Sequence, residues 1–169
     1  MKKFLAVFLA IVSIFTISGC SLDKKTAYMK TANNFTEKIN ESYVNILRTA
    51  AVLSVAYGAI NKSNPNSLKE YSDLVDSYLA EAVTRSEEYT AIIISNAPSI
   101  SELYNKLLKC PDEYKVIKNE AENMYELYLF LLECVTADFE NYLSWFAEFE
   151  DEATEFEESL EKMRTYIAP

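Results

Sequence analysis

The sequence predicts an all-α protein built as an antiparallel, up-down helical bundle. It holds only 2 Gly and 4 Pro in 169 residues, too few turn residues for a sandwich of short strands. Its 12 Tyr and 9 Phe make the chain too apolar to stay disordered. Beyond the first twenty residues, apolar side chains recur every three or four positions, which is the period of an amphipathic helix.

The first twenty residues have a different pattern, typical of a secretion signal. Lys2 and Lys3 precede an uncharged apolar run of 14 residues, 4–17. A helix needs about 20 apolar residues to span a bilayer, so this run fits the core of a signal peptide better. It ends in Ile-Ser-Gly-Cys at residues 17–20, which resembles the lipobox of bacterial lipoproteins.

The resemblance implies that residues 1–19 are a signal peptide and that Cys20 becomes the lipidated N-terminus. Family members usually have Leu where this chain has Ile17. Ser21, in place of the Asp that retains lipoproteins in the inner membrane, implies an outer-membrane destination if the cell has two membranes. We therefore expect a protein anchored by lipid in the bacterial cell envelope, with residues 20–25 as its tether. The alternative is an ordinary cleaved signal with Cys20 as an incidental thiol.

Charge and composition exclude several classes of function. Loss of the leader, which carries two Lys and no acid, changes the net charge from −10 to −12. Such an anion should not bind nucleic acid, and lipid chains rather than electrostatics should hold it at an anionic membrane. The chain has no His, which removes Ser-His-Asp and Cys-His mechanisms and His-ligated metals. We predict that it is not an enzyme and holds no cofactor or metal.

Two further cysteines, Cys110 and Cys134, follow the leader. If the residues between them are mostly helical, they lie about 36 Å apart, whereas a disulfide needs Cα atoms within about 7 Å. We expect no bridge between them and expect both to pack as small apolar side chains.

Residues 26–61 are predicted to form the first helix. Its apolar positions share one face. They are Tyr28, Ala32, Phe35, Ile39, Tyr43, Ile46, Ala50, Leu53, Tyr57 and Ile60. From Thr49 to Ile60 the helix is apolar almost all round, so neighbouring elements should enclose it. The polar stretch 61–66 predicts a turn.

Ser67 and Glu70 form a capping-box pattern that predicts the start of a second helix. We expect this helix to end near Asn96, because Pro98 follows. Its predicted apolar face consists of Leu68, Tyr71, Val75, Tyr78, Ala82, Tyr89 and Ile92.

Ser99 and Glu102 repeat the capping pattern and predict a short helix that ends near Leu108. Pro111 should then kink or restart the chain, with Asp112 and Glu113 in a new first turn.

Residues 112–167 contain no Gly or Pro. Their apolar series is Tyr114, Ile117, Ala121, Met124, Tyr128, Leu131, Val135, Phe139, Tyr142, Phe146, Phe149, Ala153, Phe156, Leu160, Met163 and Ile167. One helix would be about 84 Å long against about 54 Å for the first. A fold-back near residues 136–138 gives four rods of similar length, which we prefer to three helices with one long helix over 112–167. Residues 26–167 then form a single domain.

Two clusters are candidates for binding. An acidic stretch includes Glu148, Glu150, Asp151, Glu152 and Glu155, with no basic residue between Lys118 and Lys162. It is either a solvated face, a docking surface for a basic protein partner or a weak site for divalent cations.

The second cluster is apolar and is predicted at the end of the bundle far from the membrane. It combines residues 51–60, residues 127–132 and the aromatic residues Trp145, Phe146 and Phe149. This cluster is either a recess for a ligand or the thickest part of the core.

These observations favour a non-enzymatic envelope lipoprotein that acts through protein–protein contacts. One alternative is an inhibitor or immunity-type lipoprotein that masks a cationic toxin or envelope enzyme. A second alternative is a carrier of a small apolar ligand in the bundle core.

Overall fold

A computed structural model describes residues 21–63, 66–136 and 142–168, and all regular structure in these ranges is helical. The helices are α2 (Ser21–Lys62), α3 (Leu68–Leu107), the 3-10 helix η1 (Asp112–Tyr114), α4 (Lys115–Thr136) and α5 (Tyr142–Ile167). The predicted all-α class is confirmed.

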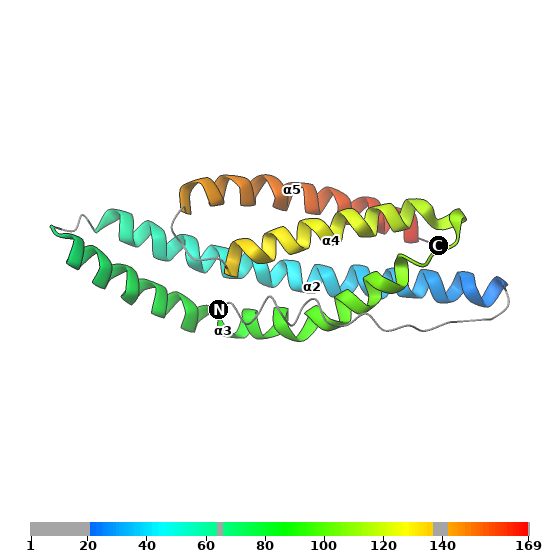
Figure 1. The fold of residues 1–169 in the computed structure, drawn as a ribbon, viewed down its shortest axis with the longest axis horizontal. Coiled ribbons are helices and arrows are strands. Elements are labelled where there is room, and N and C mark those ends of the chain that lie inside the picture. The colour runs from blue at the N-terminus through cyan, green and yellow to red at the C-terminus, as the bar shows by residue number, and fades with distance from the viewer. Residues whose placement is uncertain (1–20, 64–65, 137–141, 169) are drawn as a thin grey trace.

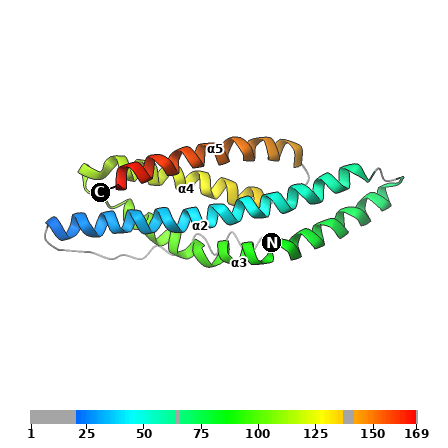
Figure 2. The ribbon, with the colours of Figure 1, turned by 180° about the vertical axis from the view of Figure 1, so that it is seen from behind.

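The four long helices run alternately up and down (Figure 1). α2 lies between α3 on one side and the α4–α5 hairpin on the other in both views (Figures 1 and 2), and it contacts all three. The start of α2, the α3–α4 connection and the end of α5 lie together at one end of the bundle. We call this the proximal end. The α2–α3 turn forms the opposite tip.

The core follows the predicted seam of the first helix. All ten seam residues of α2 are buried, with at most 8% of their surface exposed. Residues from the other three helices pack against them, including Ile100, Leu107, Met124, Tyr128 and Phe156. Stacked rings add to this packing. The ring centroids of Tyr43 and Phe156 are 4.3 Å apart, and those of Tyr104 and Tyr125 are 4.1 Å apart.

The predicted end of the second helix before Pro98 is wrong, because α3 continues through Pro98 to Leu107. Pro98 cannot donate a hydrogen bond to the carbonyl of Ile94. Both residues lie on the exposed side of α3, so water can satisfy that carbonyl. On the opposite side Ile93 and Ile100 are buried against the core, and this burial holds the helix together across the proline. α3 is bent in Figure 1, as expected of a helix that contains proline.

Continuation through Pro98 also changes which side chains of α3 are buried. The buried apolar residues in its second half are Ile93, Ala97, Ile100 and Leu107, and the three large ones are spaced by seven. The predicted seam residue Ile92 is only half-buried, and Tyr71 is 46% exposed. In a single uninterrupted helix, the burial of Ile100 and Leu107 determines which side of the whole helix faces the core.

Local signals are confirmed in part at the other helix ends. The amide of Glu70 donates to Ser67 Oγ at 3.1 Å, as the capping pattern predicts. The Glu70 carboxylate reaches back to the amide of Asn66, at 2.8 Å, rather than to Ser67. Ser99 and Glu102 lie inside α3 and start no helix. The first helix begins at Ser21, five residues before the predicted Thr26.

The chain reverses around Pro111 and not at Pro98. Pro111 precedes η1, and Asp112 and Glu113 occupy its first turn, so the predicted restart at Pro111 is confirmed. The fold-back after Thr136 is also confirmed, because α4 ends there and α5 begins at Tyr142. The alternative with one long C-terminal helix is therefore wrong. Phe139 lies outside the described residues.

The prediction of four rods of similar length is wrong. α2 and α3 have 42 and 40 residues, whereas α4 and α5 have 22 and 26. At 1.5 Å per residue, the long pair exceeds the short pair by more than about 20 Å. The α2–α3 hairpin therefore projects beyond α4 and α5 (Figure 1). Val55 is 65% exposed on this projection, so the expected full enclosure of residues 49–60 is also wrong.

Among the described residues, one stretch, Lys24–Ile60 within α2, is long and apolar enough to cross a membrane by length and composition alone. Half of the residues in its most apolar part are buried inside the bundle. Its seam contacts the other three helices, which is the position of a central core helix.

Truncation of Ile100 to Ala tests the continuity of α3. We expect Ile100→Ala to lower the free energy of unfolding by about 2–5 kcal/mol, because it leaves a cavity in the core. The matched variant Ile94→Ala, at a 49% exposed position of the same helix, should change it by no more than about 0.5 kcal/mol. Urea denaturation measures both. Similar losses for the two variants would contradict the observed phase of α3.

Candidate functional site

The predicted lipidation residue, Cys20, lies outside the described residues. α2 begins at the next residue, Ser21, at the proximal end of the bundle. Any group attached to Cys20 is therefore joined directly to the central helix of the fold.

Four of the five candidate acids lie on one face of α5. Glu148, Asp151, Glu152 and Glu155 follow the three- and four-residue spacing that places side chains side by side on a helix. We call these four residues the acidic face. Glu150 lies about 200° round the helix from Glu148 and is separated from the others. Three members of the acidic face are exposed and Glu152 is half-buried.

The acidic face is not neutralised by neighbouring helices. Burial raises the pKa of Glu152, and the carboxylates of Glu155, Asp151 and Glu148 raise it further. The five ion pairs among the described residues each join two residues of one helix, and none involves the acidic face. This part of α5 therefore presents a concentrated negative field to solvent.

The side of α5 that faces α2 is fixed by a tyrosine. Tyr43 Oη lies 2.9 Å from a Glu157 carboxylate oxygen and 3.1 Å from the carbonyl oxygen of Ala153, and it can donate to either. Burial and the bond to Glu157 raise the pKa of Tyr43. On the α4 side, buried Ser159 accepts from Asn123 at 3.2 Å and donates to Glu120. These contacts set the rotation of α5, and so the direction of the acidic face.

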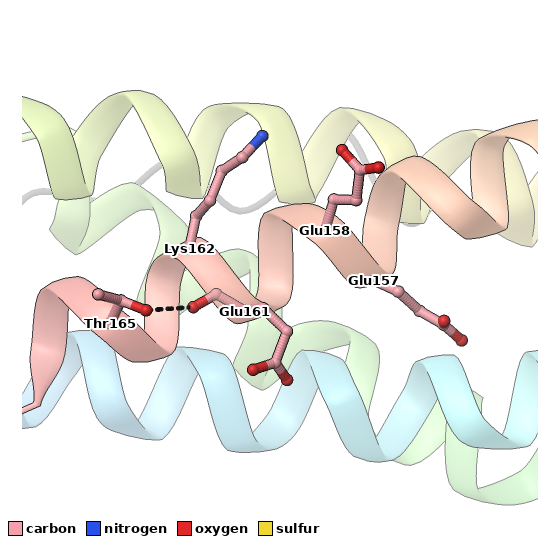
Figure 3. Close-up of a pocket in the computed structure, with 5 residues that line it drawn as sticks. All are labelled: Glu157, Glu158, Glu161, Lys162 and Thr165. Atoms are coloured by element: carbon pink, nitrogen blue, oxygen red, sulfur yellow. Dashed lines mark hydrogen bonds between the residues drawn. The ribbon is translucent and has the colours of Figure 1, made fainter.

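A shallow hollow lies further along α5, lined by Glu157, Glu158, Glu161, Lys162 and Thr165 (Figure 3). Glu157 and Glu161 point toward α2, whereas Glu158 and Lys162 point toward α4 (Figure 3). The charged groups diverge rather than converge. Among the described residues, no group of three or more His, Cys, Asp or Glu side chains is placed to hold a metal ion.

The predicted apolar cluster lies mostly in the core. Leu127, Tyr128, Leu131 and Phe149 are buried within the main core. Leu53 and Ala56 form a smaller cluster with Ala82 of α3, and Val135 packs against both clusters. Phe146 is half-buried, and the side chain of Trp145 lies outside the described part of the chain. These residues favour a core over a recess.

Cys110 and Cys134 are not joined by a disulfide. Cys134 is buried in the main core. Cys110 is half-buried at the proximal end, beside the hydroxyl of Tyr28.

One polar contact between helices was not predicted. Asn96 of α3 donates to the Glu41 carboxylate at 2.9 Å and accepts from Lys38 Nζ at 3.2 Å. Lys38 Nζ also donates to the Glu41 carboxylate, at 2.9 Å. The bonds that Glu41 accepts from Lys38 and Asn96 lower its pKa. Helical spacing places Asn96 on the same buried face as Ile93 and Ile100. The sequence indicates this only if the helix is continued through Pro98.

Comparison of this chain with protein-family models, with curated proteins and with solved structures finds no match in any of the three.

The variant Glu152→Gln tests the electrostatics of the acidic face. A carboxyl whose pKa is raised by folding destabilises the fold once it ionises. This cost is absent below the ordinary pKa of 4.5 and grows as pH rises through the folded value. Glu152→Gln should therefore stabilise the protein by a few tenths of a kcal/mol at pH 7, and the gain should disappear near about pH 3.5.

Glu150→Gln is the matched control, because no acid lies three or four residues from Glu150. Thermal melts of both variants at the two pH values provide the measurement. An equal gain in stability for both variants, or a gain that increases at acid pH, would contradict the mutual repulsion of the four carboxylates in the acidic face.

Proposed function

We propose that this protein is a non-enzymatic, lipid-anchored component of the bacterial cell envelope that acts through contacts with other proteins. One observation carries the proposal. A leader with a charged start, a short apolar run and a lipobox-like end stops at Cys20, and helix α2 starts at the very next residue. A signal peptide alone requires no cysteine at that point, whereas two acyl chains on Cys20 would give a stable anchor.

The position of the acidic face supports a role in protein contacts. It lies in the first half of α5, whose other end reaches the proximal end of the bundle (Figure 1). With the anchor at the proximal end, the acidic face stands away from the membrane and remains accessible. A negative field of this kind accelerates the approach of a basic protein partner.

The inhibitor or immunity-type alternative uses the same acidic face but predicts one tight cationic target. The carrier alternative finds less support. Two hollows on the described residues, one on α5 and one between α2 and α3, are shallow and are lined mainly by charged and polar side chains.

The lipid anchor is tested by the mature N-terminus. We expect the protein purified from bacterial membranes to begin at Cys20, with acyl groups that mass spectrometry detects on that residue. Cys20→Ser should abolish both the processing at this position and the acylation. A mature protein that begins at another residue, or an unmodified Cys20, would overturn the proposal.

The protein contact is tested by neutralising the acidic face. Changing Glu148, Glu152 and Glu155 to Gln and Asp151 to Asn should reduce capture of basic envelope proteins at low salt, where exposed charges are least screened. High salt should reduce capture by the unchanged protein as well.

A matched control neutralises four exposed acids of α3. These are Asp73, Asp76, Glu87 and Glu88. Binding that survives loss of the acidic face, or that both sets of changes weaken equally, would reject the acidic face as the contact surface.

A further inference from the structure

The fold gathers most of the basic residues at the proximal end. Nine of the fourteen Lys and Arg that follow Cys20 lie in the three segments that meet there. They are Lys24, Lys25, Lys30, Lys106, Lys109, Lys115, Lys118, Lys162 and Arg164. The segments come from all four helices (Figure 1). Tyr28 fixes their register, because its hydroxyl donates to the carbonyl of Leu107 at 3.4 Å and its ring stacks on Tyr114 at 4.9 Å.

Charge is therefore separated along the axis of the bundle. The three proximal segments, residues 21–30, 106–118 and 162–168, hold nine basic and three acidic residues. With the ion-pair partners Glu102, Glu122 and Glu161 included, the proximal end holds nine basic and six acidic residues, a net charge of +3. The remaining residues after Cys20 hold five basic and 20 acidic residues, a net charge of −15. The net charge of the whole chain conceals this separation.

The proximal charges are available to a partner. All nine side chains are exposed except that of Lys118, which is half-buried. Lys106, Lys118 and Arg164 each pair with an acid of their own helix. Among the described residues the other six take part in no ion pair.

The acidic face lies further along α5 than the proximal basic residues. Along α5, Glu155 lies about 10 Å from Lys162, and Glu148 lies about 21 Å from it. The Debye length is about 8 Å at physiological ionic strength. Glu157, Glu158 and Glu161 lie nearer, around the hollow that also contains Lys162. The positive charge of the proximal end therefore rests on the six basic residues outside ion pairs, Lys24, Lys25, Lys30, Lys109, Lys115 and Lys162.

We propose that the proximal end is a docking surface for the headgroups of anionic phospholipids. This inference rests on the proposed anchor at Cys20, and α2 leaves no spacer between that residue and the bundle. Lys24 and Lys25 lie within about two helical turns of Cys20, so acyl chains in a bilayer bring them to headgroup level. Lysine and arginine held at an anionic surface are attracted to it. The proposal differs from the expectation from net charge alone, that lipid chains rather than electrostatics hold the protein at an anionic membrane.

Docking through the proximal end has a structural consequence. It stands the bundle on the membrane, with the projecting α2–α3 hairpin pointing outward. The acidic face then lies beyond the reach of the membrane charge and open to other proteins.

The test uses the intact lipoprotein in vesicles of phosphatidylcholine alone or of phosphatidylcholine with phosphatidylglycerol. Vesicle flotation and the acyl mass first establish anchoring, so failure of the anchor is recognised separately. A water-soluble amine-reactive reagent then labels exposed lysines, and mass spectrometry measures the labelling rate at each one. Lys62 and Lys69, at the opposite tip, are internal controls.

We expect several-fold slower labelling of Lys24, Lys25, Lys109 and Lys115 in the anionic vesicles than in the neutral ones. Lys62 and Lys69 should label equally in both. The difference should disappear at 1 M salt, where the Debye length is about 3 Å.

A paired variant adds a second test. Lys109→Gln with Lys115→Gln should restore part of the labelling of Lys24 and Lys25 in anionic vesicles, whereas Lys62→Gln with Lys69→Gln should not. Equal labelling of an anchored protein in the two kinds of vesicle would overturn the docking surface. So would protection that is unaffected by salt.

Discussion

The architecture depends on the continuity of α3 across Pro98. A proline inside a helix costs about 3 kcal/mol. Full burial of a large aliphatic side chain contributes about 1.5–3 kcal/mol, and Ile93, Ile100 and Leu107 are all buried. A break in the helix at Pro98 would turn at least Ile100 and Leu107 away from α2. The tertiary contacts of α3 therefore outweigh the local preference of proline, and the unpaired carbonyl of Ile94 lies on the solvent side, where water satisfies it.

The unbroken α3 determines where the charges lie. Had the chain reversed at Pro98, Lys106 and Lys109 would lie about 12 and 17 Å along the next helix. The observed reversal around Pro111 instead brings Lys109 and Lys115 beside the start of α2. The same reversal leaves 22 and 26 residues for α4 and α5, so the longer hairpin projects. One local feature thus accounts for the basic residues at the proximal end, the separation of the acidic face from that end and the projecting tip.

The sequence predicted those parts of the fold in which local and tertiary preferences agree. The seam of α2 has no Pro, and all ten positions that its spacing identified are buried. The fold-back after Thr136 followed from a length argument. α3 could not be predicted in the same way, because the rule for proline is local whereas the contacts of Ile100 span the whole fold. The acidic face follows from helical spacing within one segment. The basic proximal end depends on segments far apart in the sequence, which only the topology brings together.

The distance between the two ends of α3 tests most directly whether this helix is continuous across Pro98. Spin labels are attached at Lys69→Cys and Lys106→Cys, both at exposed positions. The protein used has no other cysteine that reacts with the label. Pulsed electron paramagnetic resonance then measures their separation. A continuous α3 predicts about 55 Å for the 37 residues between them. A separation near about 30 Å, as expected for a reversal at Pro98, would contradict the account.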